Sequence, residues 1–274
     1  MSYKFWMFLI MLFAPNLLLA QSTEKEYGLN FAWQVKQVDE FIERFNNDPS
    51  SFINEYAQKS GQAGPLTREK MIKSLFNAKA SGWNYQQIND FIKQVSSPDA
   101  PQYLDFNGDG WFARVKCRVL CNGRPEDATL ILQTDTLANG ASKWVIADIN
   151  FSERVRLALK KDSAEELLPC PAPADSTTSY NPMSHATGFL NIDLATRNPE
   201  NISNFVIGPG DRSRNLNLFI DACLRKRFKI VRANSVTYSF LQIKGWRIEI
   251  SQFTRQSMNS GWLISKLALV KKRS

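Results

Sequence analysis

A hairpin pattern near the end of the chain is the feature that most constrains the fold. Apolar and polar side chains alternate over residues 246–253, and a second alternating stretch covers residues 262–270. The segment Met258-Asn259-Ser260-Gly261 between them has the composition of a turn. Alternation with period two on both sides of such a turn is typical of an antiparallel strand pair with one buried face.

The same plan occurs earlier, over residues 128–151. A strand pattern, the turn Asn139-Gly140 and a second strand pattern that opens on Trp144 follow in the same order as in the last hairpin. Trp262 opens the corresponding strand there. We therefore expect the chain to contain two copies of one plan. In this alignment the predicted helix at 213–224 corresponds to the helix that begins at Thr67, and the helix at 84–95 has no counterpart.

Helical patterns precede the strands. We expect a helix from Asn30 to about Asn46, a short helix after Pro49, a helix capped by Thr67 and a helix over residues 84–95, each with apolar residues three or four positions apart. Strand patterns follow at 111–121, 129–134 and 143–151. Helices followed by antiparallel strands indicate the α+β class.

Composition divides the chain into a leader, two domains and a linker. Residues 5–19 are almost wholly apolar and precede Ala20, which predicts a secretory signal peptide at 1–20 and a periplasmic or secreted protein with no transmembrane segment after cleavage. The charged and proline-rich stretch 153–182 predicts a helix followed by a linker. It separates a first domain at 21–152 from a second at 183–274.

The order of elements resembles the cone-shaped fold of the nuclear transport factor 2 superfamily, and more narrowly its exported bacterial members without an assigned function. The resemblance rests on the helix at 35–45, on Asp48-Pro49 and Asn198-Pro199, and on the strands opened by Trp144 and Trp262. It covers most of residues 27–151 and 183–270. It implies two tandem cone-like domains, each with short helices packed on a curved antiparallel sheet.

The resemblance also suggests an enzyme as an alternative function. Members such as ketosteroid isomerase and scytalone dehydratase use a carboxylate, Tyr or His inside the cone. Asp148 has the strand parity of Trp144 and Ile146, so it could face an apolar cavity and act as a general base with a raised pKa. A strand-end carboxylate in solvent or in a salt bridge is the structural alternative, and no His accompanies it.

Positive charge is concentrated in the second domain. The formal net charge is +8, and residues 176–274 carry 15 Lys and Arg against 5 Asp and Glu, whereas residues 21–150 carry 14 against 16. The candidate binding residues are Arg225, Lys226, Arg227, Lys229, Arg232 and Arg247. They fit an electropositive face for an anionic envelope component, docking onto the acidic first domain or a partner protein, or a solvated surface without a ligand. No motif for specific nucleic-acid binding is present.

The sequence holds one weak metal pattern. Asp105, Asn107 and Asp109 match the first half of a calcium loop and Gly110 follows in the expected place, but Lys116 stands where a bidentate Glu belongs. A tight turn before the next strand explains the same residues, and we expect neither a metal nor a cofactor.

The four cysteines leave two possibilities open. Cys117, Cys121, Cys170 and Cys223 could form disulfides in an exported protein or remain buried thiols. Cys117 and Cys121 would lie ~13 Å apart along one strand, beyond the ~7 Å that a disulfide can bridge, so any bridge would join them to other segments.

The sequence therefore predicts an exported, non-catalytic binding or assembly module of the cell envelope. Its basic second domain would contact an anionic component or a partner protein. A small-molecule cavity enzyme that uses Asp148 is the alternative.

Overall fold

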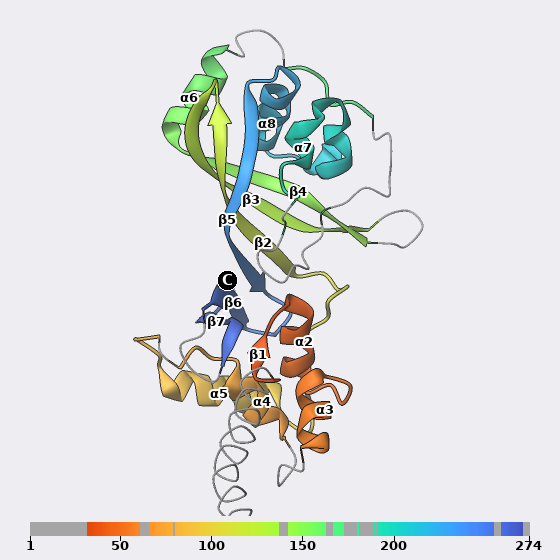
Figure 1. Ribbon diagram of the computed structural model, residues 1–274, viewed down its shortest axis with the longest axis vertical. Coiled ribbons are helices and arrows are strands. Elements are labelled where there is room, and N and C mark those ends of the chain that lie inside the picture. The colour runs from red at the N-terminus through yellow and green to blue at the C-terminus, as the bar shows by residue number, and fades with distance from the viewer. Residues whose placement is uncertain are drawn as a thin grey trace, which may run out of the picture.

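The protein is an α+β fold built on one open sheet (Figure 1). The computed structural model describes residues 32–60, 66–78, 80–136, 142–162, 167–172, 180, 189, 191–254 and 259–270. Its helices are α2 (Val38–Asn46), α3 (Phe52–Lys59), α4 (Arg68–Ser74), α5 (Tyr85–Val95), α6 (Glu153–Asp162), α7 (Leu194–Arg197), the 3-10 helices η1 (Pro199–Phe205) and η2 (Pro209–Asp211), and α8 (Arg214–Leu224). The predicted signal peptide lies outside the described residues.

Within the described residues, seven strands form a single sheet in the order β1-β7-β6-β5-β2-β3-β4. Only β1 runs parallel to its neighbour. The strands are β1 (Gln34–Val35), β2 (Trp111–Cys121), β3 (Arg124–Thr136), β4 (Ser142–Phe151), β5 (Phe228–Phe240), β6 (Trp246–Phe253) and β7 (Ser260–Leu269).

The sheet joins both halves of the sequence at its centre. β2 and β5 pair antiparallel along their whole length, from Trp111 opposite Phe240 to Cys121 opposite Phe228. Two separate cone-like sheets are therefore not confirmed, because the strands of both halves share one ladder of hydrogen bonds. The domain limits drawn at 21–152 and 183–274 remain a prediction.

The helices of each half pack on the hairpin of the other half (Figure 1). Phe91 of α5 meets the Trp246 ring of β6 at 5.2 Å, and the Trp246 indole N–H donates to Gln94 at 2.8 Å. Phe76, just after α4, forms a parallel bridge with Ile264 of β7. At the other end of the molecule, α8 packs on β4. Neither set of helices therefore covers only its own strands.

The two hairpins nevertheless have the same construction. Leu132 pairs with Ile146 in β3–β4, and Ile250 pairs with Ile264 in β6–β7, a constant separation of 118 residues. Each hairpin has a β-bulge at the equivalent place, and Ile146 is bridged by Val206 as Ile264 is bridged by Phe76. The shared register and bulge support duplication of the hairpin.

This register corrects the alignment of the helices. The bridge at Phe76 is followed by α5, and the bridge at Val206 is followed by α8; both helices have 11 residues. By its place in the fold, α8 therefore corresponds to α5 and not to the helix at Thr67. The sequence alignment was wrong here because it compared apolar spacing and had no information on attachment to the sheet.

The first predicted helix also begins later than expected. Gln34 and Val35 form β1, and α2 begins at Val38. Val35 pairs with Gly261, whose φ is +85°, and a Cβ on Gly261 would lie 1.8 Å from the Val35 carbonyl oxygen. Pairing with the sheet thus overrides the helical spacing of the apolar residues. The predicted cap, Asn30, lies outside the described residues.

Aromatic rings fill the space between the sheet and its helices. Trp111 stacks on Phe240 at 5.1 Å and meets Trp144 edge-on at 4.7 Å, while Tyr238 meets Trp262 at 4.9 Å. All five rings are buried. Trp144, whose strand face was predicted to line an apolar cavity, is therefore packed against other aromatic rings.

Candidate functional site

Asp148 of β4 lies beside the N-terminus of α8 and not in the aromatic interior. The bulge in β4 places Asp148 opposite Ile131 and Ile146 opposite Leu132, so Ala147 is the extra residue. Asp148 therefore loses the parity that the sequence predicted for it. Its carboxylate accepts hydrogen bonds from the Ser213 hydroxyl at 2.5 Å and from the Ile149 amide at 2.8 Å.

The contact with Ser213 suggests a positioning role for Asp148. Ser213 is the N-cap of α8 and accepts the Leu216 amide at 3.1 Å. A carboxylate at this end of a helix is favoured by the helix dipole. The hollows described below are not lined by Asp148. Its role as a general base remains a prediction.

The calcium-like segment forms a docked turn. Asp105 accepts the Asn107 amide at 2.9 Å, and the Gln242 side chain donates to the carbonyl oxygens of Asp105 at 2.8 Å and Asp109 at 2.9 Å. These bonds attach the turn to the loop after β5. Among the described residues, no three His, Cys, Asp or Glu side chains gather as a metal site would require.

The four cysteines stand as thiols and not in disulfides. Cys117, Cys121 and Cys223 are buried and Cys170 is half-buried. Burial raises the pKa of the Cys117 thiol to about 12 and also raises the pKa of Cys223. These two thiols therefore stay protonated, and the structure corresponds to the second of the two possibilities left by the sequence.

Three of the six predicted cations are engaged within the protein. Arg225 and Arg227 bind the carboxylate of Asp221 at 2.9 and 3.0 Å, and Asp221 is fully buried. Arg247 on β6 binds Glu249 at 2.7 Å, which also binds Arg114 at 3.0 Å. A buried carboxylate requires such partners. These three side chains therefore have structural contacts of their own.

The other three predicted cations lie along one exposed part of the sheet, together with cations of the first half. Lys226, Lys229 and Arg232 are exposed. Arg232 of β5 stands directly opposite Arg118 of β2, and Lys229 stands opposite Leu120. We call the exposed side chains on this outer face, which is opposite to the buried face of β2, the basic surface: Lys116, Arg118, Lys229 and Arg232.

Two more cations flank the basic surface at the end of the sheet. Cys121 pairs with Arg124 where β2 turns into β3, and the Asn122 amide donates to the Arg227 carbonyl at 2.8 Å beside Lys226. Arg124 and Lys226 are both exposed. The first-half cations escaped the sequence analysis because their segment has a slightly negative net charge. The alternation of Arg114, Lys116 and Arg118 along β2 was the signal that could have found them.

A β-bulge turns Arg232 outward. Val119 pairs with Ile230 and Arg118 pairs with Arg232, so Val231 is an extra residue in β5. Without it, Arg232 would share the inward parity of Ile230. Bulges are a common means of redirecting a side chain. The basic surface thus depends on this irregularity.

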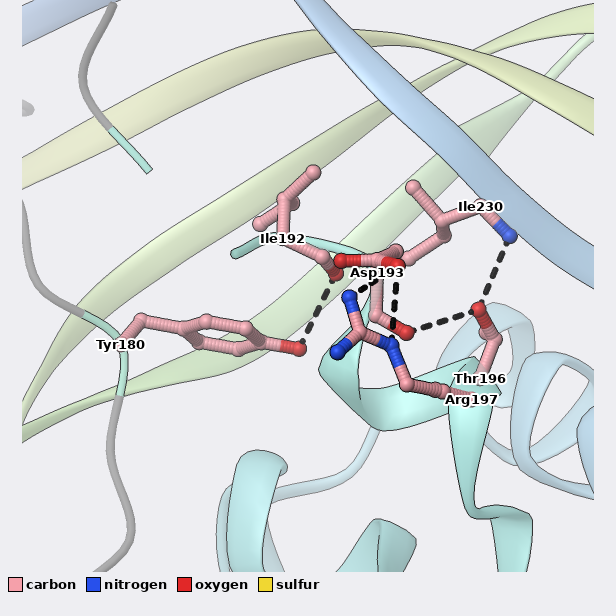
Figure 2. Close-up of polar contacts among 6 residues, drawn as sticks. All are labelled: Tyr180, Ile192, Asp193, Thr196, Arg197 and Ile230. Atoms are coloured by element: carbon pink, nitrogen blue, oxygen red, sulfur yellow. Dashed lines mark hydrogen bonds and ion pairs between the residues drawn. The ribbon is translucent and has the colours of Figure 1, made fainter. Parts of the chain in front are cut away.

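Helix α7 fastens β5 beside the same bulge (Figure 2). The Thr196 hydroxyl accepts the Ile230 amide at 3.0 Å and donates to the Asp193 carbonyl at 3.1 Å. Tyr180, whose pKa is raised by complete burial, donates to the Ile192 carbonyl at 3.3 Å. The bond between Thr196 and Ile230 thus ties α7 to β5 two residues before Arg232.

Stability does not explain the pair of arginines. Like charges directly opposite each other on neighbouring strands are destabilising. Among the described residues, Arg118 has one compensating ion pair, with Asp127 at 3.0 Å, and both side chains are exposed to solvent. Exposed pairs of this kind contribute about 0–1 kcal/mol. An arrangement that is unfavourable for folding is a candidate for binding.

A polar hollow of about 500 Å³ adjoins the basic surface. Asn150, Thr129, Lys116 and Ser235 form an in-register row across β4, β3, β2 and β5. Lys116, Thr129 and Asn150 line the hollow together with Asp127, Phe151 and Asn234. Within the described part of the chain, the side chains of Lys116, Thr129 and Asn150 make no hydrogen bond or ion pair. Their polar atoms are available to a ligand.

A second hollow of about 360 Å³ lies between α4 and α5 and is lined by Glu69 and the lysines Lys70, Lys73 and Lys93. It lies at the opposite end of the molecule from the polar hollow and provides sites for control substitutions. No helix among the described residues is long and apolar enough to cross a membrane.

Comparison with known proteins finds no match to a family model, to a curated protein or to a solved structure.

Proposed function

We propose that this protein is an exported, non-catalytic binding module and that its basic surface contacts an anionic component of the cell envelope. The observation that carries the proposal is the juxtaposition of Arg118 and Arg232 on neighbouring strands, with Lys116 and Lys229 beside them. The predicted signal peptide supplies the compartment.

The arrangement favours a ligand with several negative charges. Neighbouring strands are about 4.8 Å apart, which is less than the screening length of ~8 Å at physiological ionic strength. The cations of β2 and β5 therefore act on a ligand together, whereas Arg225, Arg227 and Arg247 are each held in an internal ion pair. Such attraction is reduced by added salt.

The resemblance to cone-shaped proteins remains part of the proposal. The duplicated hairpin with its shared bulge supports a tandem origin, and the exchange of helices between the halves would explain why two cones share one sheet. In this view, joining the halves is what brings the cations of β2 and β5 together.

The test compares two charge reversals of equal size in the whole chain. The variant Arg118→Glu with Arg232→Glu alters the basic surface, and Lys70→Glu with Lys93→Glu alters exposed residues at the other end of the molecule. Retention on heparin-agarose is measured over a salt gradient, with circular dichroism to confirm folding.

We expect the arginine variant to elute at much lower salt than the unaltered protein and the lysine variant to elute close to it. Equal elution of the two variants would refute the proposal, because net charge alone would then explain retention.

A further inference from the structure

The polar hollow has a composition that indicates the class of ligand. It combines the cation Lys116, which has no partner among the described residues, with the hydroxyl of Thr129 and the amides of Asn150 and Asn234. A dense polyanion such as nucleic acid or polyphosphate would require mainly cations. Amides and hydroxyls, which both donate and accept hydrogen bonds, suit the hydroxyl groups of a sugar.

We propose that the ligand of the hollow is an acidic oligosaccharide, in which each unit carries a carboxylate or sulfate together with free hydroxyls. This inference rests on the proposed function and names its ligand class. The acid groups would bind Lys116 and the adjoining Arg118 and Arg232. The hydroxyls would bind the neutral polar residues that line the hollow, Thr129, Asn150 and Asn234.

Asp127 distinguishes this ligand from a dense polyanion. Its carboxylate lines the hollow, is largely exposed and pairs with Arg118 at 3.0 Å. A phosphate chain would place negative charges against this carboxylate. A sugar hydroxyl can donate to Asp127, and an acid group of the next unit can take its place on Arg118, because the exposed pair contributes little to stability.

The geometry of the row fits an extended oligosaccharide. The row crosses four strands in register from Asn150 to Ser235, at about 4.8 Å per strand, which is close to the advance of one sugar unit along an extended chain. Phe151 lines the same hollow and is half-buried, and its ring meets Phe228 edge-on at 5.7 Å.

The experiment changes hydrogen bonding without changing charge. Asn150→Ala combined with Thr129→Val removes two neutral polar groups, one exposed and one half-buried, from the outer face. Asn89→Ala on α5 is the matched control, since Asn89 is exposed and lines the other hollow. Isothermal titration calorimetry on the whole chain measures binding of a galacturonic acid hexamer, of neutral maltohexaose and of a linear polyphosphate of matched charge.

We expect the galacturonic acid hexamer to bind most tightly, and the Asn150 and Thr129 substitutions to weaken it about tenfold. Their effect on polyphosphate should be absent, and Asn89→Ala should change neither. If these substitutions leave hexamer binding unaltered while Arg118→Glu with Arg232→Glu abolishes it, the sugar assignment is overturned and the proposed function stands. If no anionic probe distinguishes the unaltered protein from the arginine variant, the proposed function fails as well.

Discussion

The exchange of helices predicts that a substitution in the first half of the sequence loosens the last hairpin. Phe91 on α5 is fully buried, and its ring contacts Trp246 of β6 at 5.2 Å, Phe45 at 6.2 Å and Phe76 at 6.4 Å. Replacing a buried Phe by Ala costs about 3–5 kcal/mol. A central value of about 4 kcal/mol corresponds to a change of roughly a thousandfold in an opening equilibrium.

Hydrogen exchange measured by mass spectrometry locates that loss. In Phe91→Ala we expect amides of β6 and β7 to exchange up to about a thousandfold faster, with a smaller effect on β3 and β4. Phe91→Leu is the milder variant should the alanine protein unfold as a whole. Phe219→Ala on α8 is the reciprocal control: its ring packs on Phe228 at 5.4 Å and its helix packs on β4, so we expect the larger loss in β4.

The contrary result is well defined. If the halves were independent domains, Phe91→Ala would accelerate exchange only within residues 32–151 and leave β6 and β7 unchanged. That outcome would refute the packing of first-half helices on second-half strands.

Three further predictions concern stability. In Gly261→Ala the new Cβ would lie 1.8 Å from the Val35 carbonyl oxygen, so the substitution should displace β1. Proteolysis near residue 35 should then become faster, and unchanged proteolysis would contradict the pairing of Val35 with Gly261. Arg68 donates hydrogen bonds to the carbonyl oxygens of Phe45 at 3.2 Å, Val95 at 2.7 Å and Gln102. Arg68→Ala should therefore lower the free energy of unfolding, measured by urea titration, by about 3 kcal/mol. A loss below about 1 kcal/mol would contradict this role. Burial raises the pKa of Cys117 from 9.0 to about 12, so the folded state favours the protonated thiol, and this stability is lost as the pH rises from about 9 towards 12. Between neutral pH and pH 10.5 the free energy of unfolding should fall by about 2 kcal/mol more in the unaltered protein than in Cys117→Ala. Equal falls in the two proteins would show that Cys117 does not contribute to the pH dependence of stability.

Local patterns predicted the strands well. The alternation from Trp111 to Cys121 corresponds to β2, with one face buried along its whole length. Both hairpins also occur where the alternation placed them. Period-two alternation is a property of neighbouring residues, and burial on one face is enough to select it.

These local patterns could not predict which distant strands pair with each other. The pairing of β2 with β5 joins segments more than a hundred residues apart, and a single sequence holds no local signal of such a pairing. The bulge at Ala147 is a one-residue change in register, and it reverses the parity inferred for Asp148. The helix inferred from Asn30 gave way to β1 for the same reason, since Val35 pairs with distant Gly261.

The basic surface could be predicted in part. The run from Arg225 to Arg232 indicated a cationic segment. The sequence analysis did not use the spacing of Asp221 and Arg225, four residues apart, which permits an internal ion pair. The contribution of Lys116 and Arg118 was hidden because net charge was counted along the chain and not across the sheet.

The central claim is that cations from both halves act on one anionic ligand. The most direct measurement is a double-mutant cycle on binding of the galacturonic acid hexamer, with Arg118→Glu and Arg232→Glu made singly and together at several salt concentrations. We expect each single reversal to weaken binding and its salt dependence, and the combined effect to differ from the sum of the two because the residues are direct neighbours. A loss of binding that follows Arg232 alone, with no effect of Arg118, would contradict the claim.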